Sequence, residues 1–178
     1  MNEKTMININ LSVNNSKEEV RKSVEKYLTE VDLPISAHDF SRPWGGFFVI
    51  EESLADRFIN LYFPHLKVSD LTIAGKLSPK ILVVAPDQRL SWQYHHRRAE
   101  IWKLISGVAG VVTSETDTEG PLKKLAKEEI IQLKQGQRHR LVGLHEGWGV
   151  IAEIWRHTDA NNPSDENDIV RVQDDFGR

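Results

Sequence analysis

The chain has 178 residues, a length that suits one domain with a sizeable hydrophobic core. It contains no cysteine, which excludes a disulfide framework and favours a reducing compartment, so we expect a cytoplasmic protein. The formal net charge of −3 gives no basic footprint for nucleic acid. No apolar run approaches the length of a membrane span, and residues Met1–Asn10 lack the pattern of a signal peptide. We therefore expect neither a nucleic-acid partner nor a membrane partner.

The first part of the chain is predicted to be helical. Ser16 followed by Glu19 forms a capping-box pattern at the start of one helix, and Pro34 ends it. The apolar residues of this helix recur at helical spacing: Val20, Val24, Tyr27, Leu28 and Val31. A second helix is predicted over residues 54–62, with Ser53 as its cap. These apolar faces indicate packing against the rest of the chain, or a subunit contact, rather than a cofactor site.

From residue 81 onward the pattern changes to short strands. Alternating or β-branched segments, separated by turn signals, are Ile81–Ala85, Arg89–His95, Ala99–Ser106, Val108–Ser114, Glu129–Leu133, His139–Gly143 and Val150–Trp155. Their number and spacing predict an all-β double-stranded jelly roll with a ligand cavity among its inward-facing side chains. We divide the chain into an N-terminal helical extension, 1–76, with a lead-in strand at Arg42–Gly45, and a barrel with a C-terminal tail, 77–178.

Two separate segments supply a candidate metal site. Gln93 and His95 are two residues apart, so on a strand their side chains leave the same face, and Glu100 follows five residues after His95. His139 comes just after the turn at Gly136. Taken singly, each of these residues would more often be ordinary polar packing, so the prediction depends on their spacing. Two imidazoles, one carboxylate and one amide oxygen suit a divalent transition metal. We expect zinc first, while nickel, manganese or iron(II) can use the same ligands.

The same spacing resembles the two-part motif of the cupin superfamily: Gln93-x-His95-x4-Glu100-x6-Gly107, then Gly136-x2-His139, with glutamine in place of the usual first histidine. Four segments are similar to type II phosphomannose isomerases, the mannose-6-phosphate isomerase family: Arg42–Gly45, Leu90–Gln93, Arg98–Trp102 and Asp168–Arg178. The resemblance covers residues 42–52 and 77–178 in order. In that family the module occurs alone or behind a sugar-nucleotide pyrophosphorylase domain. No such segment precedes it here, so we expect a stand-alone cupin module.

The resemblance implies a metal-dependent aldose–ketose isomerase acting on a hexose phosphate, mannose 6-phosphate to fructose 6-phosphate. Arg98, Arg171 and Arg178 are the candidate phosphate-binding residues, because guanidinium groups match phosphate oxygens. Glu153 matches a glutamate of the family and is a candidate general base, although it could equally be the partner of a nearby arginine. Dimers are common among jelly-roll cupins, so the resemblance allows a homodimer.

Several positions depart from the family pattern, among them Asp87 in place of a glycine and Lys134 in place of a proline. Arg97 and Ile101 stand where the isomerases tend to have histidine, which would change the rim of the pocket, and Gly143 replaces an asparagine. These departures leave an alternative open, a non-catalytic or regulatory cupin that binds a sugar phosphate. Turnover of mannose 6-phosphate would support the enzyme, whereas binding without turnover would support the alternative.

Overall fold

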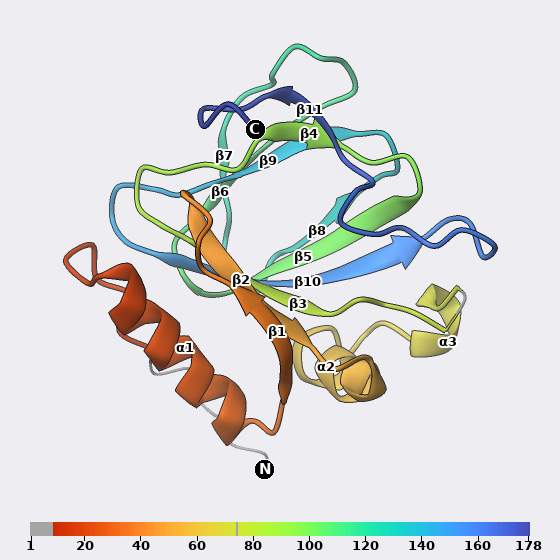
Figure 1. The fold of residues 1–178 in the computed structure, drawn as a ribbon, viewed down its shortest axis with the longest axis horizontal. Coiled ribbons are helices and arrows are strands. Elements are labelled where there is room, and N and C mark those ends of the chain that lie inside the picture. Colours follow the sequence, from red (N-terminus) through yellow and green to blue (C-terminus); the bar gives the residue numbers. More distant parts are fainter. Residues whose placement is uncertain (1–8, 74) are drawn as a thin grey trace.

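The computed structural model describes residues 9–73 and 75–178, in which two antiparallel sheets face each other (Figure 1). The six-stranded sheet has the order β1-β2-β3-β10-β5-β8 and contains β1 (Ile35–Asp39), β2 (Gly45–Ile50), β3 (Lys80–Val84), β10 (Gly149–His157), β5 (Arg98–Gly107) and β8 (Ile130–Leu133). The five-stranded sheet has the order β11-β4-β9-β6-β7 and contains β11 (Val170–Gln173), β4 (Trp92–Tyr94), β9 (Arg138–Val142), β6 (Gly110–Ser114) and β7 (Lys123–Lys124). This arrangement is the predicted jelly roll.

The helices cover the outer face of the six-stranded sheet (Figure 1). They are α1 (Lys17–Glu30), α2 (Ala55–Tyr62), α3 (Val68–Leu71) and a 3-10 turn, η1 (Glu52–Leu54). One buried cluster joins helix and sheet residues: Val24, Leu28, Phe58, Ile59, Ile81, Val83, Val150 and Ala152. The apolar helix faces therefore pack on the sheet. No helix among the described residues is long and apolar enough to cross a membrane. The expectation about a signal peptide falls mainly on residues 1–8, which lie outside the described residues.

A second hydrophobic cluster fills the space between the two sheets. It contains Leu82, Val84, Leu104 and Ile151 of the larger sheet and Val111 and Leu141 of the smaller one. Strands β3 and β10 are buried almost throughout because each contributes to both clusters. Along these strands, alternate residues point towards the helices and towards the space between the sheets. This alternation decides which polar side chains reach the interior of the barrel.

The two predicted helices begin in different ways. The capping box is confirmed, since Ser16 Oγ accepts a hydrogen bond from the backbone N–H of Glu19 at 3.2 Å and the Glu19 carboxylate accepts one from that of Ser16 at 2.8 Å. The prediction for Ser53 is wrong, because this residue lies inside η1 and Leu54 precedes α2 without a side-chain cap. Instead, the Glu52 carboxylate accepts backbone hydrogen bonds from the chain just before β3. A long-range contact therefore holds the start of the second helix.

Several strands differ from the prediction. Arg42–Gly45 is mainly a turn, and the lead-in strand starts at its last residue. The strand predicted over 89–95 is only β4, with Arg89 in an isolated bridge to Val142. Strands β1, β7 and β11 were not predicted, because they lie at sheet edges and show little apolar alternation. The division at residue 76 stays a prediction, and β1 and β2, which precede it, belong to the same sheet as β3.

Gly143 lies where the chain after β9 passes close to another segment. Its backbone N–H donates to the Gln88 carbonyl at 2.6 Å, and a Cβ atom added to it would lie 1.8 Å from the Ala85 carbonyl oxygen. The asparagine of the family therefore does not fit here unless the backbone shifts. We expect Gly143→Ala to lower the free energy of unfolding by about 1–3 kcal/mol, the usual cost of overpacking. Urea denaturation measures this difference, and a variant as stable as the wild type would contradict the steric account.

Candidate metal centre and substrate pocket

Three of the four predicted metal ligands meet in the interior between the sheets. His95 follows β4, Glu100 lies in β5 and His139 lies in β9, and all three side chains are buried. Their ligand atoms lie within 4.8 Å of one another. The Nε2 atom of His95 is 3.1 Å from one Glu100 carboxylate oxygen, and that of His139 is 3.4 Å from the other. This group could hold a metal ion.

Both imidazoles are oriented by backbone carbonyl groups. His95 Nδ1 lies 2.6 Å from the Asp168 carbonyl oxygen, and His139 Nδ1 lies 3.0 Å from that of Gln137. Because a carbonyl oxygen only accepts, each Nδ1 carries a proton, and in a neutral imidazole Nε2 presents its lone pair beside Glu100. Burial lowers the pKa of His95, which favours the neutral form that binds metals.

His139 gives the clearest indication of a missing partner. Its Nε2 atom is buried and has no hydrogen-bond partner among the described residues. A buried acceptor without a partner is costly, and a cation beside a carboxylate would satisfy it. An imidazole whose other nitrogen donates to a carbonyl is also the usual form of a metal-bound histidine. The donor set therefore fits a divalent cation.

Gln93, the predicted fourth ligand, lies beside this group. It pairs with His139 across β4 and β9, and its side chain lines the pocket described below. Its side-chain oxygen accepts a hydrogen bond from Ser91 Oγ at 2.6 Å. The carboxamide is therefore held in place by Ser91, and its role as a ligand stays a prediction.

Arg98, predicted to bind phosphate, is buried next to the ligands. Its Nε atom donates to Glu100 at 2.9 Å and its Nη2 atom lies 3.2 Å from His95 Nε2, while the guanidinium carbon lies 3.6 Å from the centre of the Trp155 ring. Its Nη1 atom donates to Ser164 Oγ at 3.0 Å. Arg98 thus contacts two of the proposed metal ligands and holds them in position, and its contact with a phosphate stays a prediction.

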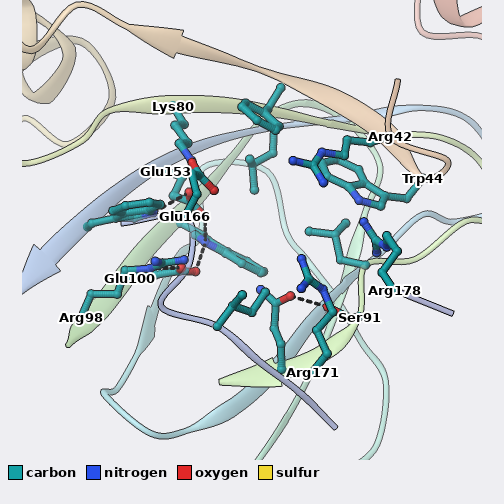
Figure 2. A pocket seen from close by; sticks show the side chains of 17 residues that line it. Arg42, Trp44, Lys80, Ser91, Arg98, Glu100, Glu153, Glu166, Arg171 and Arg178 are labelled. Atoms are coloured by element: carbon teal, nitrogen blue, oxygen red, sulfur yellow. Dashed lines mark hydrogen bonds and ion pairs between the residues drawn. The ribbon is translucent and has the colours of Figure 1, made fainter. Parts of the chain in front are cut away.

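A pocket opens above Glu100, and Figure 2 shows the side chains around it. Its charged lining residues are Arg42, Lys80, Arg98, Arg171 and Arg178 with Glu100, Glu153 and Glu166. Its aromatic lining residues are Trp44, Phe47, Trp102 and Trp155. In Figure 2, Arg42, Arg171 and Arg178 lie on one side, opposite Lys80 and Glu153. The pocket therefore combines a cationic side with a side that carries carboxylates.

Glu153 faces this pocket from β10. Its two carboxylate oxygens accept hydrogen bonds from the indole N–H groups of Trp102 at 2.8 Å and Trp155 at 2.9 Å. Burial and the nearby charge of Glu100 raise its pKa to about 7. A carboxyl group that titrates near neutral pH can both take up and release a proton. The hydrogen-bond partners of Glu153 are thus indoles rather than arginines, and its role as a general base stays a prediction.

The two tail arginines differ in their partners. Arg178 binds the Asp174 carboxylate through Nε at 2.9 Å and Nη2 at 3.0 Å. Arg171 lies in β11 opposite Gln93 of β4, and its guanidinium has no hydrogen bond or ion pair among the described residues. Burial and the charges of Arg178 and Arg42 lower the pKa of Arg171. An anion in the pocket would relieve this concentration of positive charge.

Two departures from the family pattern lie away from the pocket, so the prediction that they change its rim is wrong. Ile101 alternates with Glu100 and Trp102 along β5 and therefore packs in the cluster beneath the helices. The Arg97 guanidinium points to the carbonyl groups of the tail at residues 162 and 163. Neither residue lines the pocket.

Lys80 lines the pocket but is not among the site residues predicted from the sequence. It lies directly opposite Glu153 across β3 and β10, forms an ion pair with Glu166, and places its ammonium group 4.3 Å from the centre of the Trp155 ring. The alternation of β3 could have indicated it, because Lys80 lies on the same inward face of the strand as Leu82. A lysine on an apolar strand can thus be assigned to the interior once the inward face is known.

His157 connects the end of β10 to the tail. Its Nδ1 atom accepts a hydrogen bond from the Ser164 backbone N–H at 3.0 Å, its Nε2 atom lies 3.1 Å from Ser78 Oγ, and burial lowers its pKa. Protonation would turn an N–H group towards the Ser164 N–H. The pKa in the folded state is therefore below the unfolded value of about 6.5, so the stabilisation is present above that pH and is lost as the pH falls.

We expect the wild type to lose more unfolding free energy than His157→Gln between about pH 7.5 and pH 5.5, where the unfolded imidazole takes up its proton. Denaturant titrations of both proteins at several pH values measure the difference. Equal pH dependence in the two proteins would show that His157 does not need to be neutral in the fold.

Comparison with known proteins places this geometry in a family. Residues 32–174 match the family model described as mannose-6-phosphate isomerase C-terminal. The chain is 30% identical over 118 residues to the mannose-1-phosphate guanylyltransferase of Escherichia coli (strain K12), which covers 66% of this chain and 23% of that protein. It is 27% identical over 165 residues to the mannose-1-phosphate guanylyltransferase of Salmonella montevideo, covering 92% of this chain and 29% of that protein. The chain thus spans less than a third of the length of these relatives.

Solved structures give a weaker likeness. A Cupin 2 conserved barrel domain protein from Salinispora arenicola CNS-205 is 24% identical, with a TM-score of 0.41 over 51% of this chain and 69% of that chain. The fold assignment depends on the two sheets described above. The family model spans both sheets and the whole candidate metal group, and the chain therefore belongs to the family of the mannose-6-phosphate isomerase C-terminal domain, with the jelly-roll barrel of a cupin.

Proposed function

We propose that this chain is a metal-dependent aldose–ketose isomerase that interconverts mannose 6-phosphate and fructose 6-phosphate. The observation that carries the proposal is the buried Nε2 atom of His139, which has no hydrogen-bond partner in the described part of the chain. It lies next to Glu100 and His95, below a pocket that also holds Glu153. The membership of the chain in the family described as mannose-6-phosphate isomerase C-terminal supports the choice of substrate.

The reaction moves one proton between carbon 2 and carbon 1 of the open-chain sugar, while a hydroxyl proton moves from oxygen 2 to oxygen 1. Glu153 takes the proton from carbon 2 and returns it to carbon 1, a transfer that its pKa of about 7 allows in both directions. The indole N–H groups of Trp102 and Trp155 hold the carboxylate in place during both transfers.

The metal ligands in this proposal are His95, Glu100 and His139, with Gln93 as the fourth. A divalent ion bound there would supply Lewis-acid stabilisation of the negative charge that develops on the sugar oxygens. Zinc is the first choice, and nickel, manganese or iron(II) can use the same nitrogen and oxygen ligands. Arg98 keeps the Glu100 carboxylate in position beside the two histidines.

The phosphate group of the substrate is proposed to bind on the cationic side of the pocket. Arg42 and Arg178 already have carboxylate partners, Asp39 at 2.9 Å and Asp174 at 2.9 Å, whereas Arg171 has none among the described residues. Arg171 is therefore the guanidinium best able to form new charge-assisted hydrogen bonds with phosphate oxygens.

Arg171→Ala is expected to raise KM for mannose 6-phosphate by roughly 10- to 100-fold, since a hydrogen bond to a charged group contributes about 1.5–3 kcal/mol. Arg138→Ala is the control, because Arg138 lies on β9 outside the pocket, against Tyr94 and Asp117. Steady-state kinetics on phosphorylated and unphosphorylated sugars separate the two roles. An Arg171 variant that loses thermal stability but keeps its preference for phosphorylated sugar would show that Arg171 stabilises the fold and does not bind phosphate.

One observation supports the second candidate, a cupin that binds a sugar phosphate without turnover. The Arg98 guanidinium already contacts Glu100 and His95, so a protein side chain partly balances the ligand carboxylate. A screen of aldose and ketose phosphates, with calorimetric binding beside an assay of turnover, distinguishes the candidates. Binding of mannose 6-phosphate without conversion would replace the isomerase by the binding protein.

A further inference from the structure

The C-terminal segment just before β11 is held by one buried carboxylate. Asp168 Oδ1 accepts a hydrogen bond from the backbone N–H of His96 at 2.9 Å, and its Oδ2 accepts one from that of Arg97 at 3.0 Å. Oδ2 also accepts a hydrogen bond from Ser164 Oγ at 2.6 Å. The first two donors belong to the turn between β4 and β5, directly after the ligand His95. The Asp168 side chain thus fixes the tail to the turn that carries this histidine.

The backbone of the same residue orients the ligand itself. The Asp168 carbonyl oxygen lies 2.6 Å from His95 Nδ1, so this ring nitrogen carries a proton. In the neutral imidazole Nε2 then keeps its lone pair, 3.1 Å from Glu100 and 3.2 Å from Arg98 Nη2. A partner of this kind sets both the tautomer and the direction of a metal-binding imidazole. The side chain of Asp168 therefore holds the turn that follows His95, while its carbonyl group orients the His95 ring.

The rest of the segment approaches the site in the same way. The Asp165 carbonyl and Ser164 Oγ both accept hydrogen bonds from Arg98, the residue that braces Glu100. Immediately afterwards, β11 pairs with β4 and sets Arg171 opposite Gln93. Docking of the segment therefore has two effects: it orients a proposed metal ligand, and it places Arg171 on the cationic side of the pocket.

We infer that Asp168 is a positioning residue, which couples docking of the C-terminal segment to the ligand geometry of the metal centre. This inference rests on the proposed metal centre but not on isomerase activity. With the segment docked, His95 presents Nε2 to the ion. With the segment released, all the ligand residues are still present, but the His95 ring is free to rotate and to change its tautomer. If Asp168 only stabilised the fold, its substitution would lower stability and leave the affinity of the folded protein for metal unchanged.

The test is the zinc affinity of the full chain, measured by competition with a chromophoric chelator. Asp168→Asn replaces an acceptor oxygen by an NH2 group, which cannot accept from the turn. The expected loss is roughly 10- to 100-fold, as for other outer partners of metal-binding histidines. Asp165→Asn is the matched control: it makes the same charge change in the same segment, and its side chain contacts Asn167 N–H and, at 3.6 Å, the guanidinium group of Arg97 rather than a ligand. Its affinity is expected to equal that of the wild type.

Ser164→Ala keeps the inference testable if Asp168→Asn does not fold. It removes one of the three donors to the Asp168 carboxylate, together with the hydrogen bond from Arg98 Nη1 to Ser164 Oγ, and is expected to give a smaller loss of affinity. Unchanged affinity in a folded Asp168→Asn protein, or in Ser164→Ala when that is the only folded variant, would overturn the inference. An equal loss in Asp165→Asn would overturn it as well.

Failure of the proposed metal centre is distinguishable from failure of this inference. If the wild type binds neither zinc nor nickel, manganese or iron(II), the metal centre is wrong, and the imidazole nitrogen NMR signals of the metal-free proteins decide the role of Asp168. The inference requires His95 to be protonated at Nδ1 in the wild type and to lose this preference in the Asp168→Asn or Ser164→Ala protein. The same tautomer in all folded proteins would overturn it.

Discussion

Glu153→Gln is expected to lower kcat for the isomerisation of mannose 6-phosphate by about 10²- to 10⁴-fold, the usual contribution of general acid–base catalysis. The glutamine side chain has nearly the same shape and can still accept a hydrogen bond from one of the two indoles, but it cannot take up the carbon-bound proton. Bound metal, measured by elemental analysis, should stay at the wild-type level. A coupled assay for fructose 6-phosphate measures the change in rate.

Glu166→Gln is the matched control for this variant. Glu166 lines the same pocket and pairs with Lys80, but its side chain is largely exposed to solvent and belongs to the tail. We expect its kcat to stay close to that of the wild type. Substantial turnover by Glu153→Gln, or an equal loss in Glu166→Gln, would mean that Glu153 does not transfer the proton.

His139→Ala is expected to remove divalent metal and, with it, turnover. The substitution deletes the buried Nε2 atom that has no other partner among the described residues, so it removes a direct ligand. The loss of affinity should be at least about 100-fold, the upper end of what an outer partner of a ligand costs. Because His139 Nε2 forms no hydrogen bond with any described residue and only approaches Glu100 at 3.4 Å, metal-free stability should change much less than affinity. Titration with zinc under chelator competition measures the first effect, and denaturant titration measures the second.

His96→Ala provides the comparison, since this imidazole follows directly after a proposed ligand but is exposed and packs edge-on against Tyr94. Its affinity for zinc is expected to match that of the wild type. Loss of zinc in His96→Ala, or retention of zinc in His139→Ala, would show that other residues bind the ion.

Strand alternation explains both the successes and one error of the sequence analysis. On β5, Glu100 and Trp102 point into the barrel because they are two residues apart, and the same rule sends Ile101 to the helix side. Ile101 was assigned to the rim of the pocket from its place in the family motif, and alternation would have corrected that assignment. The inward face of β10 likewise decides that Glu153 reaches the pocket, which the sequence alone left open.

Other parts of the site could not be predicted from local pattern. Strand β11 is short and mostly exposed, so nothing in its sequence shows that it pairs with β4 and brings Arg171 to Gln93. The partners of His95 and His139 at Nδ1 are backbone carbonyl groups, which every residue has and which therefore leave no mark in the sequence. The role inferred for Asp168 depends on contacts with residues that are about 70 positions away in the chain. Long-range pairing of this kind becomes visible only in the folded chain.

The central claim is that the metal group and Glu153 together isomerise a hexose phosphate. The most direct measurement is an NMR time course of mannose 6-phosphate with the zinc-loaded wild type, beside the same protein after treatment with a chelator. We expect conversion to an equilibrium mixture with fructose 6-phosphate by the loaded protein, loss of conversion after chelation, and recovery when zinc or another divalent ion is restored. An unchanged mannose 6-phosphate spectrum with protein that carries a full complement of metal would contradict the account.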